Sequence, residues 1–265
     1  MNTKDNYHLT EQKFWELYWK NLQLPAVVNP NFSFDRCLSK ALLTRLDELP
    51  SPLSSKGRRS ILEVGAAPGK WLALFPRDRY AVSGIEYSQQ GMDALRRNMD
   101  LLGIMPLDLI YGDFFAIKPK ASYDVVMSLG FVEHFDDPVQ VIRLHTEWLC
   151  PGGALVIGVP NFTGLHGFAQ RLLDREILRA HNTKMMNRTF FEALPASLGI
   201  DKWSFEYLGS FEPALPMTFR SKTLTNIIPK VALRLASYLR RWRWLDCINS
   251  PFISSYMLAI YRKPE

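Results

Sequence analysis

Short apolar runs alternate with amphipathic stretches in the central part of the chain. The apolar runs predict strands at Ile61–Val64, Ala81–Ile85, Leu107–Tyr111, Tyr123–Met127 and Leu155–Val159. Two stretches between them, Ser88–Leu102 and Pro138–Leu149, have the period of helices. Strands that alternate with helices are typical of a mostly parallel sheet covered on both faces. We therefore predict an α/β fold.

The two ends of the chain extend this pattern. Helices are predicted around Thr10–Leu22 and Arg36–Leu49, before a stretch rich in Pro and Ser. Two late apolar runs, Trp203–Phe211 and Ser255–Tyr261, predict strands that complete a seven-stranded sheet. We thus expect a helical lead-in over residues 1–59, with a possible role as a lid, and one α/β domain over residues 60–265.

The segment 162–198 interrupts the alternation of strands and helices. It contains a helix-like stretch, Gly167–Arg179, and a polar turn at His181–Thr183. We interpret it as a cap inserted after the fifth strand, where it would contact substrate. A plain crossover helix is the alternative.

Composition narrows the classes of protein. With 265 residues, 47% of them hydrophobic, the chain can form one sizeable core. Cys37, Cys150 and Cys247 show neither a disulfide framework nor a CxxC spacing, which favours a reducing, cytoplasmic environment. No His/Cys/Asp cluster has metal-ligand spacing, so we expect no metal. The first residues lack the apolar core of a signal peptide, and no apolar run reaches the roughly 18 residues of a membrane span.

Positive charge is concentrated late in the chain. The net charge is +6, and the stretch between Glu212 and Asp246 carries Lys and Arg residues but no acid. Residues 227–245 predict a basic amphipathic helix. Such a helix suits an anionic membrane surface, at the inner face of a membrane, although a solvated helix that packs on the domain has the same pattern.

The first predicted strand leads into the glycine-containing turn of Ile61–Lys70. Gly65 and Gly69 allow the backbone to approach a ligand closely, and we expect a helix to begin near Pro68 and offer free N–H groups. NAD-binding enzymes have a similar glycine-containing turn, and a strand-to-helix turn that binds no ligand can have the same sequence.

Two acids at the ends of the next strands sharpen this interpretation. Glu86 follows Gly65 by 21 residues, the offset at which an acid accepts hydrogen bonds from ribose hydroxyls. Asp113 ends the third strand, where it can accept from an adenine amino group while Phe114 packs on the ring face. Three acids at successive strand ends, with Glu63 as the first, predict a site for adenosine.

These motifs resemble class I S-adenosylmethionine-dependent methyltransferases, and within them the UbiE-related type 11 and type 12 subgroup. The likeness covers about residues 60–161. It rests on Glu63–Lys70, Glu86 and Asp113, on Tyr123–Val126 with Phe131–Pro138, and on the turn Leu149–Leu155. It implies a Rossmann-like fold and methyl transfer that yields S-adenosylhomocysteine.

The resemblance also implies site residues. The cofactor is expected to contact Glu63, Gly65, Ala66, Ala67, Gly69, Glu86, Tyr87, Asp113, Phe114, Ser128, Leu129, Gly130 and His134. Substrate contacts are expected at Asn161, His166, His181 and Asn182. An oxygen or nitrogen acceptor can require a general base, for which His134 and His181 are the candidates, although His134 can instead pack beside the cofactor.

The acceptor is expected to be a small biosynthetic intermediate, with a lipid- or polysaccharide-linked acceptor as the alternative and DNA excluded. Ala67-Pro68, where the family usually has a glycine, gives a Gly-Ala-Ala-Pro-Gly turn like that of FtsJ-like RNA ribose methyltransferases. Their Lys-Asp-Lys-Glu set has no counterpart at Ser128–Phe131, which disfavours RNA. NAD-dependent dehydrogenation is disfavoured because the turn is not G-x-G-x-x-G. A non-catalytic adenosine-binding module is a further alternative.

Overall fold

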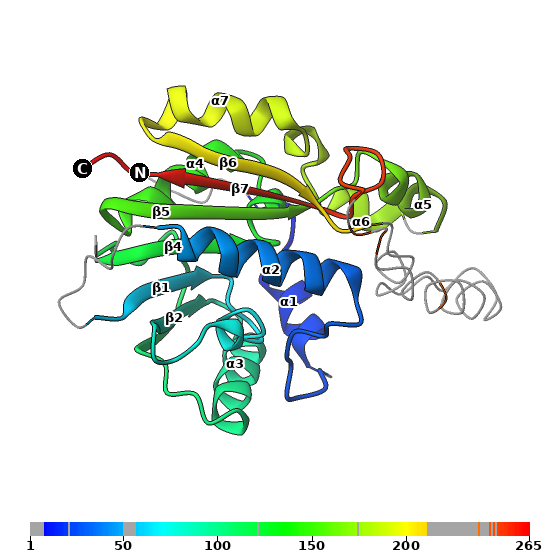
Figure 1. Cartoon of the computed structure of the whole chain (residues 1–265). Helices are drawn as coiled ribbons and strands as arrows, with labels where there is room; N and C mark the ends of the chain where they lie inside the picture. Colours follow the sequence, from blue (N-terminus) through cyan, green and yellow to red (C-terminus); the bar gives the residue numbers. More distant parts are fainter. Residues whose placement is uncertain are drawn as a thin grey trace, which may run out of the picture.

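The computed structural model contains one seven-stranded sheet with the order β3-β2-β1-β4-β5-β7-β6 (Figure 1). The structure describes residues 8–20, 22–49, 57–120, 122–173, 175–210, 238, 244, 246 and 248–265. The strands are β1 (Arg59–Val64), β2 (Tyr80–Glu86), β3 (Asp108–Tyr111), β4 (Tyr123–Leu129), β5 (Leu149–Pro160), β6 (Asp201–Leu208) and β7 (Tyr256–Arg262). Strand β7 pairs antiparallel with both β5 and β6, and the other four pairings are parallel, so the predicted α/β class and the seven strands are confirmed.

Both faces of the central strands are buried, which explains why these strands appear in the sequence as continuous apolar runs. In β4, Val126 packs in one core cluster, whereas Val125 and Met127 pack in the other. In β5, Leu155 packs in the same cluster as Val126, and Val156 packs in the other. The alternation of side chains along a strand thus builds two cores, one on each face of the sheet.

Helices cover the two faces in pairs. The lead-in helix α2 (Ser33–Asp47) and α3 (Gln89–Leu101) contribute to one core, and α4 (Pro138–Glu147) and α7 (Arg188–Leu198) contribute to the other. Figure 1 shows α2 lying across the sheet. The first helix, α1 (Gln12–Trp19), has no buried residue in its span and contacts α3.

The segment between β5 and β6 has two parts. Helices α5 (Leu165–Leu173) and α6 (Arg175–Arg179) lie beyond the carboxyl end of β5 in Figure 1, and the short helix η3 (Thr183–Met185) follows them. Helix α7 instead packs on a face of the sheet, as a crossover helix does, and the hydroxyl of Tyr261 donates to the Phe191 carbonyl at 2.8 Å. The cap therefore stays a prediction for the part before α7.

The helix expected near Pro68 is not formed, so that prediction is wrong. The chain after β1 makes a tight turn in which the Gly69 amide donates to the Ala66 carbonyl at 2.6 Å, and the next helical element is the short η1 (Leu72–Leu74). Gly69 has a φ of +85°, and a Cβ there would lie 2.5 Å from the Met99 side chain. A left-handed residue packed against α3 ends any helix at its first turn.

The basic helix predicted over residues 227–245 falls almost wholly outside the described residues. Of that range only Tyr238 and Trp244 are described, and both side chains are exposed. Among the described parts of the chain, no helix has the length and apolar character needed to cross a membrane.

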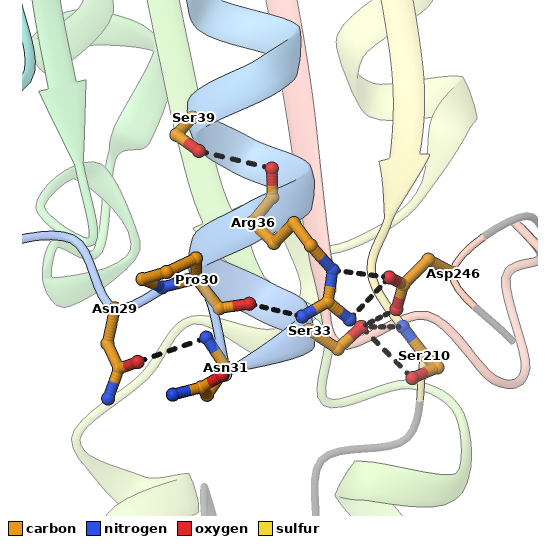
Figure 2. A network of polar contacts seen from close by, with 8 residues as sticks. All are labelled: Asn29, Pro30, Asn31, Ser33, Arg36, Ser39, Ser210 and Asp246. Atoms are coloured by element: carbon orange, nitrogen blue, oxygen red, sulfur yellow. Dashed lines mark hydrogen bonds and ion pairs between the residues drawn. The ribbon is translucent and has the colours of Figure 1, made fainter. Parts of the chain in front are cut away.

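A polar network fastens α2 to the end of β6 and to Asp246 (Figure 2). The Asp246 carboxylate accepts from the Ser33 hydroxyl at 2.5 Å and from Arg36 Nε at 2.7 Å. The Ser33 hydroxyl in turn accepts from the Ser210 amide at 3.0 Å. These groups are largely buried, so their hydrogen bonds hold segments together that are distant in the sequence.

We expect Asp246→Asn to lower the free energy of unfolding by about 1–3 kcal/mol, because hydrogen bonds to a partly buried charged group are lost. Urea unfolding followed by circular dichroism measures this change. Glu192→Gln is the matched control, since Glu192 pairs with Arg188 and Lys202 at the surface, and a much smaller effect is expected there. Equal losses in the two variants would contradict the assigned role of the network.

Candidate functional site

Polar side chains gather at the carboxyl edge of the parallel strands, where the adjoining loops begin. Glu63 lies near the end of β1, Glu86 ends β2, and Glu133 follows β4 in the short helix η2 (Val132–His134). Tyr256 starts the antiparallel strand β7 and therefore lies at the same edge. In open α/β sheets, ligands bind outside the carboxyl ends of the strands.

Glu63 is a buried carboxylate, and one of its oxygens accepts no hydrogen bond from the described residues. Its side chain is 2% exposed, and within the described chain Oε2 has no hydrogen-bond partner. Burial, with the nearby charge of Glu86, raises the pKa of Glu63 well above its ordinary value. An unsatisfied buried carboxylate costs free energy, and a ligand that brings positive charge or donors would recover it.

Glu86 lies beside the turn that follows β1. Its Oε2 accepts from the Ala67 amide at 3.3 Å, and its Oε1 accepts from the amides of Tyr87 and Ser88 at 3.0 and 2.9 Å. Burial raises the pKa of Glu86, and these amides act against that rise. Each carboxylate oxygen can accept more than one hydrogen bond, so donors of a ligand can still be received.

Helix α1 is docked over this edge. Both Glu16 carboxylate oxygens accept from the first amides of α3, those of Gln89 and Gln90, at 2.8 and 2.9 Å. The Trp19 ring lies 2.9 Å from the position of a Cβ on Gly91, and Glu86 lies equally close to that position. A carboxylate at a helix N-terminus is a favourable contact.

The residues that precede α1 also pack at this edge of the sheet. Leu9 donates its amide to the His134 carbonyl at 2.8 Å, and His8 pairs with Phe135 as an isolated β-bridge. The ring centroids of Trp15 and His134 are 5.0 Å apart, at nearly right angles. The lead-in therefore lies near Glu86 and contacts the loop after β4.

The structure separates the two residues predicted to bind adenine. Asp113 is exposed, and its Oδ1 accepts from the Phe115 amide at 3.0 Å. Phe114 is 5% exposed and packs in the core against Phe131 and His145, at centroid distances of 6.1 and 4.8 Å. The position of Phe114 does not support the prediction that it packs on the adenine ring, because burial in the core already uses this side chain.

The other predicted cofactor residues lie in the turn after β1 and in the loop after β4. Gly65 has a φ of +72°, and a Cβ there would lie 2.7 Å from Phe131, so only glycine fits at this close approach. The Ser128 hydroxyl at the end of β4 is buried, and the described residues provide it with no hydrogen-bond partner. The remaining members of this set are Ala66, Ala67, Gly69, Tyr87, Leu129 and Gly130.

The histidines predicted as catalytic come together although 47 residues separate them. The ring centroids of His134 and His181 lie 4.4 Å apart. Burial, and then the charge of His181, lower the pKa of His134 to about 3, so that its imidazole is neutral at physiological pH. Glu133, which the sequence analysis did not select as a site residue, lies beside them with a carboxylate whose pKa burial raises to about 8.

The predicted substrate residues have different surroundings. Asn161 is buried and uses its amide to hold nearby loops, donating to the carbonyls of Pro251 and Ser254 at 2.8 and 2.9 Å. Asn182 donates to the carbonyls of Phe135 and Asp136 at 3.1 and 3.2 Å, so it positions the chain beside η2. His166 is buried in α5 at 1% exposure. His181 and Asn182 are both half-buried, so these two are more accessible to a substrate than Asn161 and His166.

A family model described as a methyltransferase domain matches residues 34–246. Among curated relatives, the 27-O-demethylrifamycin SV methyltransferase of Amycolatopsis mediterranei is 27% identical over an alignment of 148 residues, and the match covers 52% of this chain and 53% of that protein. The aligned parts make up 36 to 53% of the curated relatives, so the chain spans about half of their length or less.

Solved structures share the fold. Phosphoethanolamine N-methyltransferase 2 of Haemonchus contortus, in complex with S-adenosyl-L-methionine, is 14% identical with a TM-score of 0.56; the match covers 99% of this chain and 59% of that one. The cyclase SpnF is 16% identical with a TM-score of 0.58, over 89% of this chain and 84% of that one. At these identities the likeness establishes the architecture alone.

We expect Glu63→Gln to stabilise the ligand-free protein above neutral pH. Because the pKa of Glu63 is raised in the folded state, its contribution to stability is full below about pH 4, the ordinary value of a carboxyl group, and is lost as the pH rises through the folded value. The gain in Tm on substitution should therefore be largest at pH 8 and shrink toward pH 4, as measured by thermal melts. Glu147→Gln, at an exposed site, is the control. A variant that is less stable than the wild type at pH 8 would contradict this account.

Proposed function

Because the chain belongs to the family of methyltransferase domains, we propose that it is an enzyme that transfers a methyl group from S-adenosylmethionine to an oxygen or nitrogen atom of a small molecule. This membership confirms the resemblance to class I methyltransferases. The observation that carries the proposal is the pair of buried carboxylates, Glu63 and Glu86, beside the tight turn after β1. The small-molecule acceptor is supported by relatives such as the rifamycin methyltransferase.

The residues at the carboxyl edge fit this cofactor. Its sulfonium and ammonium groups carry positive charge, which the buried and incompletely paired Glu63 favours. Glu86, beside the turn, is placed to accept from ribose hydroxyls, and the exposed Asp113 to accept from the adenine amino group. The close approach of Gly65 to Phe131 brings the turn after β1 next to the loop after β4.

The sulfonium supplies an activated methyl group, so the protein has to position the acceptor and exclude water. Helix α1, with Trp15 against His134, covers the edge and excludes water from it. His181 is placed to remove a proton from the acceptor, because it is accessible and adjacent to His134. His134, with a pKa of about 3, is a poor base near pH 7 and serves better as a positioning group.

Substrate selection is assigned to the segment between β5 and α7, which lies beyond the carboxyl end of the sheet. Its His181 and Asn182 contact the loop after β4, so a change in this segment alters the position of the acceptor. Attachment to an anionic membrane surface through residues 227–245, and with it a place at the inner face of a membrane, stays a prediction.

We expect isothermal titration calorimetry to show binding of S-adenosylmethionine, with an affinity at least about tenfold lower in Glu86→Ala. Hydrogen bonds to a charged acceptor contribute about 1.5–3 kcal/mol, and about 1.4 kcal/mol corresponds to a factor of ten. The exposed-site variant Glu147→Gln should bind like the wild type. A methyl-transfer screen of phenols, amines and glycans then identifies the acceptor. If the wild type binds neither S-adenosylmethionine nor S-adenosylhomocysteine, the proposed function is wrong.

Removal of residues 1–24 should abolish cofactor binding and leave the sheet folded, because α1 contacts the edge but contributes no buried residue. Glu16→Ala in the full chain should weaken binding by a smaller factor, since it loses the hydrogen bonds from two amides at the start of α3. Lys13→Ala, exposed on the same helix, is the control. Calorimetry and circular dichroism give the two readouts. Unchanged affinity in the truncated protein would exclude a lid.

A further inference from the structure

Three side chains with the chemistry of metal ligands meet beside the loop after β4. Glu133 and His134 belong to η2, and His181 precedes η3. Each offers one ligand atom, and these atoms all lie within 4.8 Å of one another. Ligands of one ion at bond lengths of about 2.1 Å are roughly 3–4 Å apart, so small side-chain adjustments bring all three onto a single ion.

The hydrogen bond of His134 leaves its Nε2 available as a ligand atom. Its Nδ1 lies 2.8 Å from the Ala180 carbonyl oxygen. A carbonyl oxygen only accepts, so Nδ1 carries the proton and Nε2 keeps its lone pair. Metal-binding histidines characteristically fix their orientation by donating the other ring N–H to a carbonyl or carboxylate.

The Glu133 carboxylate has an unused acceptor in a buried place. The residue is 1% exposed, and Oε2 has no hydrogen-bond partner among the residues the structure describes. A cation would satisfy this carboxylate directly.

The backbone fixes the two halves of the cluster relative to each other. The Asn182 amide donates to the Glu133 carbonyl at 2.6 Å, and the Asn182 side chain donates to Phe135 and Asp136. The Leu9 amide donates to the His134 carbonyl from the other side. The three ligand residues therefore sit on a preorganised frame and need no large rearrangement to bind an ion.

We propose that Glu133, His134 and His181 bind a divalent transition-metal ion that takes the oxygen of the methyl acceptor as a further ligand. Two imidazoles and one carboxylate suit zinc, iron, manganese or cobalt, whereas magnesium and calcium prefer sites made wholly of oxygen. Three protein ligands leave positions open for an exchangeable ligand.

The second half of this proposal rests on the proposed methyl transfer. With the ion bound, the lone pair of His181 is used by the metal, so His181 does not act as the base. A hydroxyl bound to the ion instead loses its proton to solvent, because the ion stabilises the oxygen anion. The oxygen then forms a bond to the methyl carbon, and the carbon–sulfur bond breaks with its electron pair left on sulfur as the thioether. The proposal also restricts the acceptor class to hydroxyl compounds, of which phenols ionise most easily.

Titration of the chelator-treated full chain with Co²⁺ tests the metal site by visible absorption. We expect binding of one ion for each chain, displacement of Co²⁺ by Zn²⁺, and an affinity at least about tenfold lower in His181→Ala and Glu133→Gln. His8→Ala is the matched control, because His8 lies near the same loop at 4.8 Å from Phe135 but outside the ligand set. His181→Gln, which keeps size and polarity, replaces the alanine variant if thermal melts show that the latter is unfolded.

The proposal is overturned if the wild type binds no Co²⁺, or if His181 and Glu133 variants bind it as tightly as the wild type. Calorimetry with S-adenosylmethionine in the presence of chelator separates this result from the proposed function. If the protein binds the cofactor but no metal, only the proposed metal site is wrong. If it binds metal but no cofactor, the proposed methyl transfer is wrong and the metal site is supported.

Discussion

Burial of both faces of the sheet is the constraint on which the rest of this molecule depends. Because α2 and α3 cover one face and α4 and α7 the other, charged groups are driven from the central strands to their ends. At the carboxyl edge the loops diverge, so polar atoms can remain without full hydrogen bonding. Glu63 and Glu133 are carboxylates of this kind, and each reduces the stability of the empty protein at neutral pH.

The same edge explains how one fold supports different chemistry. The cyclase SpnF shares this architecture, so the sheet alone does not specify methyl transfer. Reaction and acceptor depend on the side chains that the loops and the segment after β5 bring to the edge. In this chain those side chains include a pair of histidines and a buried carboxylate, which set the loop after β4 apart from the turn after β1.

Local patterns predict the strands well, because an apolar run buried on both faces needs no knowledge of its neighbours. The sequence predicts the turn after β1 less well, because Gly69 stops the expected helix only through its packing against α3. Phe114 shows a similar limit: its ring enters the core, which its position after Asp113 does not reveal. The meeting of His181 with Glu133 depends on the path of the chain over 48 residues, and no spacing rule predicts it.

The anchoring of α1 has a kinetic consequence. Glu16 accepts hydrogen bonds from amides at the start of α3, and Trp19 lies close to Glu86, so under the proposed lid role a nucleoside at this edge lies beneath α1. Release of the demethylated product then requires the helix to detach first. Helix departure, and not bond making at the methyl carbon, would set the turnover rate at saturating substrate.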